Sequence, residues 1–169
     1  MDILITDFIS RIDFGEVQGF KNLQIIPLFT KGEEGPVYLT LKEALEKRLL
    51  VIKEVSAEAS VPELKVINNA DVSVLLLDGE EVAGAKQNRV LNTSILVKEK
   101  SELIIPVSCT EQGRWSYQTD EFSNSENILS YKIRGKKAAS VSDSLRESGN
   151  YTSNQGAIWE NIEEMSESA

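Results

Sequence analysis

The sequence predicts an α+β protein that is mainly β, with an antiparallel β-sandwich or a barrel-like sheet and peripheral helices near both termini. Between residues 64 and 117, apolar and polar residues alternate in short segments about ten residues apart, which is typical of antiparallel strands. Near both ends of the chain, apolar residues recur instead at helical spacing. The chain shows no internal repeat, so we expect a single domain over residues 1–169.

The first part of the chain, residues 1–20, is expected to be a helical segment that ends near Gly15. Apolar residues recur there at helical spacing, namely Ile5, Phe8, Ile9 and Ile12. The β-rich core, residues 23–117, then begins with a strand over residues 23–30. Pro27 interrupts this strand and favours an edge or bulged position, because proline has no N–H to donate.

One helix is predicted inside the core, near residues 41–50. Thr40 and Glu43 fit a capping box, in which the threonine hydroxyl accepts from the Glu43 amide and the glutamate carboxylate reaches back. An apolar stripe follows, formed by Leu41, Ala44, Leu45 and Leu49. The next segment, residues 51–55, has the composition of a strand.

The alternating part of the core predicts strands around residues 72–76, 90–97 and 103–109. The pair Asp78-Gly79 follows the first of these and is a strong signal for a hairpin. We therefore expect the strands on either side of it to pair.

The last quarter of the sequence predicts a surface loop and then helices. Residues 118–131 are polar and suit a loop, whereas residues 138–167 show helical spacing. Ser140 or Ser142 is a candidate cap for the first of these helices, and Asn154 for the last.

Composition excludes several classes of site. The chain has no histidine and one cysteine, Cys109, which rules out His-based triads, His-ligated zinc and disulfide or C-x-x-C chemistry. We therefore expect no metal and no cofactor. The net charge of −9 argues against binding long nucleic acid. The acidic start and the lack of a long apolar run lead us to expect a cytoplasmic protein with no membrane partner.

The densest group of polar side chains precedes the strand over residues 90–97. Its candidate ligand-binding residues are Lys86, Gln87, Asn88, Arg89 and Asn92. Gly84 and Ala85 are small enough to let the backbone approach a ligand closely, and the polar residues offer charge and directed donors. An ordinary solvated turn has a similar composition.

A second polar group follows the strand over residues 103–109. Its candidates are Gln112, Arg114 and Trp115 for a ligand, with Glu111 for catalysis. Trp115 is suited to stacking on a base and Arg114 to pairing with a phosphate. The alternative is that Trp115 lies in the core and Arg114 pairs with Glu111. Cys109 is expected to be buried and inert, because no histidine can activate it.

These two groups resemble a known bacterial domain family of unknown function. The similarity lies in residues 75–93 and 105–115, with further matching blocks at 138–146 and 153–159. The family is named for its association with ADP-ribosylglycohydrolases and rhodanese-like phosphatases. The resemblance implies a role near NAD and ADP-ribose metabolism, and it establishes no reaction.

Three functions are compatible with the sequence. The first is binding of a nucleotide-like anion such as ADP-ribose, NAD or a related cyclic nucleotide, without turnover. In it, Lys86 and Arg89 hold phosphates, Asn88 and Gln112 hold ribose hydroxyls, and Trp115 stacks on the base.

The second function is hydrolysis of an ADP-ribosyl or phosphoester bond, with Glu111 or Glu80 as the general base. The third is a structural domain that forms a homo-oligomer, in which acidic neighbours pair with Arg89 and Arg114.

Overall fold

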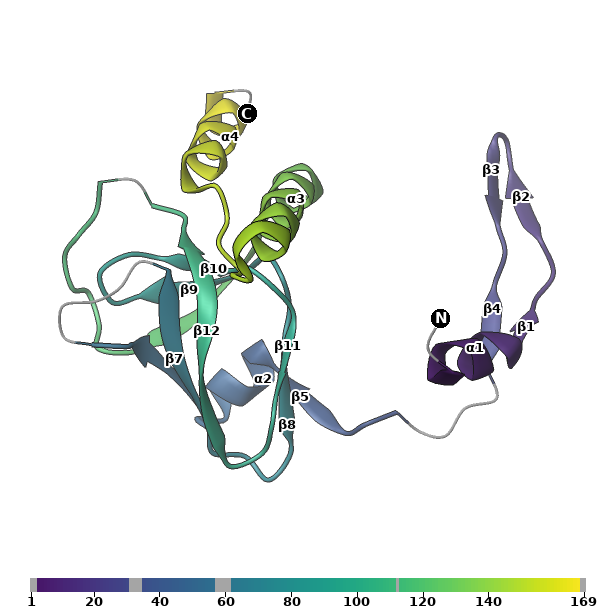
Figure 1. The fold of residues 1–169 in the computed structure, drawn as a ribbon, viewed down its shortest axis with the longest axis horizontal. Helices are drawn as coiled ribbons and strands as arrows, with labels where there is room; N and C mark the ends of the chain where they lie inside the picture. The colour runs from purple at the N-terminus through teal and green to yellow at the C-terminus, as the bar shows by residue number, and fades with distance from the viewer. Residues whose placement is uncertain (1–2, 31–34, 57–61, 112, 168–169) are drawn as a thin grey trace. The chain divides into compact units, whose positions relative to one another are not determined.

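The computed structural model describes residues 3–30, 35–56, 62–111 and 113–167 (Figure 1). By its internal contacts the chain divides into two compact units, residues 1–36 and residues 37–169. The expectation of one domain over the whole chain stays a prediction.

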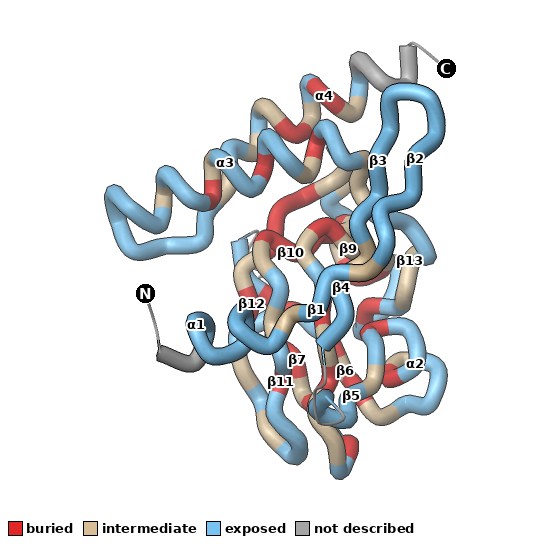
Figure 2. The backbone as a smooth tube through the Cα atoms, turned by 90° about the vertical axis from the view of Figure 1, so that its right-hand side faces the viewer, coloured by how far each residue is buried: buried red, intermediate tan, exposed pale blue. Residues whose placement is uncertain are grey.

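The first unit contains a helix and two small antiparallel sheets. Helix α1 (Ile3–Ser10) is followed by β1 (Ile12–Phe14), β2 (Gln18–Phe20), β3 (Leu23–Ile25) and β4 (Leu28–Thr30). Strand β1 pairs with β4, and β2 with β3. None of the side chains described in this unit is buried (Figure 2).

The sequence predicted the break at Pro27 in this unit but not the end of its helix. The helix was expected to continue to Gly15, which is wrong, because residues 12–14 leave the helix to pair with residues 28–30. The interruption at Pro27 is confirmed, since β3 and β4 lie on either side of it and pair with different strands.

The second unit is built on a six-stranded antiparallel sheet that curls into a half-barrel. Its strand order is β13-β9-β10-β12-β7-β6. The strands are β6 (Leu50–Glu54), β7 (Glu63–Asn68), β9 (Glu80–Gly84), β10 (Arg89–Leu91), β12 (Ser101–Cys109) and β13 (Phe122–Ile128). A bridge between Lys53 and Glu121 links the two edges of the sheet. The predicted fold class, mainly β with helices near both ends, is confirmed.

A three-stranded sheet completes the β-structure of this unit. It has the order β11-β8-β5, from β5 (Tyr38–Thr40), β8 (Ser73–Leu76) and β11 (Ile95–Val97). Strand β5 runs parallel to β8, whereas β11 is antiparallel to it. The two sheets share one apolar core, which includes Ile52, Leu64, Leu76 and Ile105.

Helix α2 (Leu41–Glu46) covers part of this core and has the predicted capping box. The Glu43 amide donates to the Thr40 hydroxyl at 3.3 Å, and the Thr40 amide donates to the Glu43 carboxylate at 2.9 Å. The helix ends before residue 50 because Arg48 adopts a left-handed φ of 57°, after which β6 begins.

The predicted hairpin at Asp78-Gly79 is wrong. Strand β8 belongs to the three-stranded sheet and β9 to the half-barrel, so the turn carries the chain from one sheet to the other. Gly79 has a φ of 86°, and a Cβ there would lie 2.7 Å from the Arg134 side chain. The single strand expected over residues 90–97 is likewise two strands, β10 and β11, in different sheets.

The polar loop expected over residues 118–131 contains strand β13, which is a further correction. Phe122 is buried, but the other residues of β13 are all exposed or half-buried, and the sequence therefore resembles a loop. Helix α3 (Tyr131–Ser148) also begins earlier than residue 138 and is capped by Ser130 instead of Ser140 or Ser142.

Helices α3 and α4 (Gln155–Glu167) lie side by side on the same side of the half-barrel (Figure 1). The Asn154 side chain accepts from the Ala157 amide at 3.2 Å, as predicted for a cap of the last helix. The buried Lys137 fixes α3 to the sheet by donating to the Leu91 carbonyl at 2.8 Å and to the Asp78 carboxylate. No helix among the described residues is both long and apolar enough to cross a membrane.

Candidate functional site

The two predicted polar groups meet at one end of the half-barrel. Arg89 at the start of β10 lies opposite Cys109 at the end of β12 in the antiparallel register. The turn over residues 85–88 and the segment over residues 110–117 are therefore neighbours. Most of the candidates come together here, namely Lys86, Gln87, Asn88, Arg89, Glu111, Arg114 and Trp115. Gln112 lies outside the described residues.

Arg114 holds the two segments together. Its Nε donates to the Glu111 carboxylate at 2.8 Å, and its Nη1 donates to the carbonyls of Ala85 and Ser116, both at 3.1 Å. Its Nη2 donates to Asn88 Oδ1 at 3.1 Å. The alternative interpretation of Arg114 as a structural partner of Glu111 is thus confirmed, and its donors are not free for a phosphate.

Glu111 is fixed as an ionised acceptor. Besides Arg114, it accepts from the Asn88 amide at 2.7 Å. Although burial works in the opposite direction, these hydrogen bonds and the charges of Arg114 and Arg89 hold the pKa of Glu111 below its usual value. A carboxylate with a lowered pKa is a poor general base.

Arg89 has a different environment, because its side chain is 0% exposed and only partly paired. Its Nη1 donates to Gln87 Oε1 at 2.9 Å, and Gln87 Nε2 donates to the Glu111 carbonyl at 3.0 Å. Among the described residues, Arg89 Nε and Nη2 have no hydrogen-bond partner.

Glu54, at the end of β6, faces this guanidinium. Its Oε1 lies 3.7 Å from Arg89 Nη2, and neither carboxylate oxygen has a hydrogen-bond partner among the described residues. Burial raises the pKa of Glu54, and the charge of Arg89, the backbone amide of Lys86 and the charge of Lys86 offset the rise only in part. Buried polar atoms in proteins are nearly always hydrogen-bonded, so this pair is chemically unusual.

Aromatic and cationic groups lie beside the buried pair. Lys86 Nζ is 5.2 Å from the centroid of the Trp115 ring and 5.0 Å from that of Tyr117. Arg89 Cζ is 5.9 Å from the Trp115 centroid. Trp115 is 49% exposed, so the alternative that it belongs to the core is wrong.

Cys109 is buried in this region, as expected. Its thiol donates to the Glu111 carbonyl at 2.9 Å, and burial raises its pKa. A thiol with a raised pKa is a weak nucleophile. No group of three or more His, Cys, Asp or Glu side chains in the described residues is placed to hold a metal ion.

Two candidates lie elsewhere. Asn92 donates to the Tyr151 carbonyl at 2.9 Å and accepts from Ser108 at 2.7 Å, so it holds the segment before α4. Glu80 accepts from the Leu77 amide at 2.7 Å, at the opposite end of β9 from the site. The structure therefore does not place Glu80 with Glu111.

Sequence reasoning missed Glu54 and Tyr117. A signal for Glu54 was present, since it continues the buried face of Leu50 and Ile52, where a carboxylate is out of place. Which residues it meets there depends on how the sheet curls, and the sequence of β6 does not carry that information.

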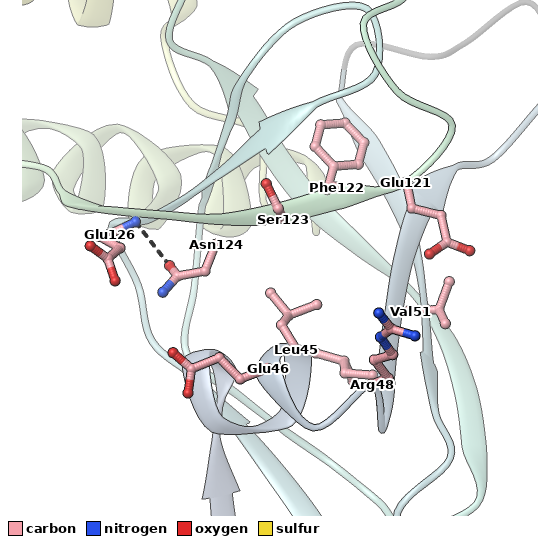
Figure 3. Close-up of a pocket in the computed structure, with 10 residues that line it drawn as sticks. Leu45, Glu46, Arg48, Val51, Glu121, Phe122, Ser123, Asn124 and Glu126 are labelled. Carbon is pink, nitrogen blue, oxygen red and sulfur yellow. Dashed lines mark hydrogen bonds between the residues drawn. The ribbon is translucent and has the colours of Figure 1, made fainter.

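A separate groove of about 570 Å³ lies between α2, β6 and β13 (Figure 3). It is lined by Leu45, Glu46, Arg48, Leu50, Val51, Glu121, Phe122, Ser123, Asn124 and Glu126. None of the predicted site residues that the structure describes lines it, and no described lining residue has a buried polar side-chain atom without a partner. We therefore place the candidate site at Arg89 and Glu54.

Fold and site together define a small, mainly β domain whose curled sheet encloses a buried arginine–glutamate pair at one end. The chain belongs to the family of the ARG and Rhodanese-Phosphatase-superfamily-associated Protein domain, whose model matches residues 11–169. The match covers the sheets, the candidate site and helices α2 to α4. Searches of curated proteins and of solved structures found no significant match.

Proposed function

We propose that this domain binds a small nucleotide-like anion at the Arg89 end of the half-barrel and breaks no bond in it. One observation supports this most directly: among the described residues, two donor atoms of the buried Arg89 have no hydrogen-bond partner, and they lie near the half-exposed ring of Trp115. The Lys86 ammonium suits the anionic group of such a ligand, the Trp115 ring suits its planar ring, and the Arg89 donors suit a hydrogen-bond acceptor on that ring. The ADP-ribosylglycohydrolase association makes ADP-ribose, NAD and cyclic nucleotides the first ligands to test.

The absence of turnover is supported by the state of the carboxylates expected to act as bases. Glu111 is held ionised by Arg114 and the Asn88 amide, and Glu80 lies at the far end of β9. The proposal also reduces the set of residues that contact the ligand. Asn88 and Arg114 form hydrogen bonds with other protein groups and support the site. In this proposal the ligand contacts Lys86, Arg89 and Trp115.

Thermal shift and calorimetric titration test the proposal with ADP-ribose, NAD, cyclic nucleotides and inorganic phosphate. A ligand that binds only the folded state raises Tm as its concentration passes Kd. We expect saturable binding of at least one nucleotide, weakened about tenfold or more by Lys86→Ala or Trp115→Ala, since each removes one charged or stacking contact. Lys132→Ala, an exposed lysine on α3, is the matched control and should bind like the wild type.

Chromatography of the ligand after prolonged incubation tests turnover, and we expect it to be recovered intact. If no compound binds at millimolar concentration, the proposal is wrong and the structural interpretation of the domain takes its place. If the ligand is cleaved, the domain is a hydrolase.

A further inference from the structure

We propose that Glu54 and Arg89 together recognise a neutral hydrogen-bonding edge on the ligand, in which an acceptor stands next to a donor. A carboxamide has such an edge, and so does a nucleobase with a carbonyl beside a ring N–H. This inference rests on the proposed function and specifies which end of the ligand enters the site. The phosphates remain outside, next to Lys86.

Arg89 has two donor nitrogens to which no described residue is hydrogen-bonded. Gln87 occupies Nη1 of Arg89, whereas Nε and Nη2 have no hydrogen-bond partner within the part of the chain that the structure describes. The buried Cys109 thiol lies near this guanidinium. Nε and Nη2 form one side of the planar guanidinium, the side that binds a ligand in a bidentate manner. Glu54 stands beside that same side, with Oε1 3.7 Å from Nη2, which is too far for a hydrogen bond.

The charge of Glu54 determines which kind of ligand group can bind beside Arg89. A phosphate or carboxylate bound to the free side of Arg89 would lie directly against the Glu54 carboxylate. The two negative charges would then face each other in a region shielded from water. The Glu54 side chain is only 5% exposed, so little solvent screens that repulsion. A neutral group that accepts from Arg89 and donates to Glu54 gives both side chains a partner and adds no charge.

The aromatic residues determine how a ligand would be oriented in the site. Arg89 Cζ lies over the Trp115 ring, and Lys86 Nζ lies within about 5 Å of the centroids of both Trp115 and Tyr117. A planar ligand ring that stacks on Trp115 can direct its edge toward Arg89, while its phosphate contacts Lys86. Because the Arg89 side chain is fully buried, the half-exposed Trp115 ring must shift when the ligand enters. In this inference Lys86 alone binds the phosphate, which the sequence predicts to contact both Lys86 and Arg89.

Ligands that differ only in the inward edge test this inference. Nicotinamide mononucleotide and nicotinic acid mononucleotide share a phosphate and a ribose, but one has a carboxamide and the other a carboxylate. GMP represents the nucleobase edge. Calorimetry at about pH 8, where free carboxyl groups are ionised, gives the Kd of each for the wild type and for Glu54→Gln. Glu63→Gln, an exposed carboxylate on the neighbouring strand β7, is the control.

We expect the amide nucleotide or GMP to bind the wild type about tenfold or more tightly than the nicotinate nucleotide, because the latter leaves Glu54 facing a like charge. Glu54→Gln should reduce that preference to about threefold or less, since a glutamine amide can donate to a carboxylate. Glu63→Gln should keep the wild-type preference.

Equal or tighter binding of the nicotinate nucleotide by the wild type would overturn the inference, whether or not Glu54→Gln folds. Binding of ADP-ribose that depends on Lys86, with none of the three mononucleotides bound, would also overturn it and would leave the proposed function intact. Failure of every nucleotide would remove both proposals.

Discussion

At the scale of single residues, Arg114 stabilises the segment that carries Trp115. Its guanidinium contacts a carboxylate, two carbonyls and an amide oxygen, a pattern that a lysine ammonium cannot reproduce. We expect Arg114→Lys to lower the free energy of unfolding by about 2 kcal/mol, measured by urea denaturation. Arg146→Lys is the control, because the exposed pair of Arg146 with Asp143 should contribute less than about 0.5 kcal/mol. Equal losses in the two variants would contradict this role.

Glu54 makes stability depend on pH in the opposite sense to an ordinary paired carboxylate. Burial raises its pKa above 4.5 in the folded protein, so the folded state binds a proton more tightly than the unfolded chain does. This carboxyl group therefore reduces wild-type stability as pH rises from 4.5 through the folded-state pKa. The Tm of Glu54→Gln relative to wild type should increase over that window and then level off. A difference that stays constant with pH would contradict the expectation.

The residue types of the site could be predicted from the sequence, whereas their roles could not. From the sequence alone, three residues are equally plausible as anion-binding residues, namely Lys86, Arg89 and Arg114. Only the contacts show that Arg114 is fully paired and that Arg89 is not. Glu54 lies in the site because the sheet curls and brings the end of β6 opposite the start of β10.

At the scale of elements, Gly84 allows the segment before β13 to pass close to the end of β9. Its φ is 136°, and a Cβ there would lie 2.6 Å from Thr119 Oγ1 and 2.8 Å from the Glu121 carbonyl oxygen. We expect Gly84→Ala to lower the free energy of unfolding by about 1–3 kcal/mol, from backbone strain and steric overlap. Gly135→Ala is the matched control, since Gly135 lies within α3 with nothing within 4 Å of the added Cβ.

The control should stabilise the protein by as much as about 1 kcal/mol, because alanine has the higher helix propensity. Chemical denaturation measures both variants. A neutral Gly84→Ala would show that the chain before β13 does not need this close approach.

Strands were easier to predict than their partners. Alternation predicted β8 and β12, and it marked the region of β10 and β11, whereas β7 and β9 were not predicted as separate strands. In β8 buried and half-buried residues alternate, which is the pattern that the sequence shows. Alternation could not show that the chain changes sheets at Gly79 and again between β10 and β11, since pairing depends on contacts distant in sequence. Strand β13 was missed for a related reason, because Phe122 is the one residue of this strand that is buried.

At the scale of the whole molecule, the two units differ in the interactions that can stabilise each of them internally. The strands of the second unit enclose an apolar core, whereas no described side chain between residues 5 and 30 is buried. Phe14 and Phe20 are 75% and 71% exposed, and each sheet of the first unit has two strands. Isolated two-stranded sheets are marginally stable in water, so local opening there should cost little free energy.

We therefore expect the backbone amides of β1 to β4 to exchange with deuterium much faster than those of β7 and β12, in native-state exchange measured by mass spectrometry or NMR. Strands β7 and β12 are the internal control, because they pair with each other in the middle of the six-stranded sheet. Equal protection of both sets would mean that another surface covers the phenylalanines of the first unit in solution, since a two-stranded sheet with exposed side chains cannot itself slow exchange to the rate of a core.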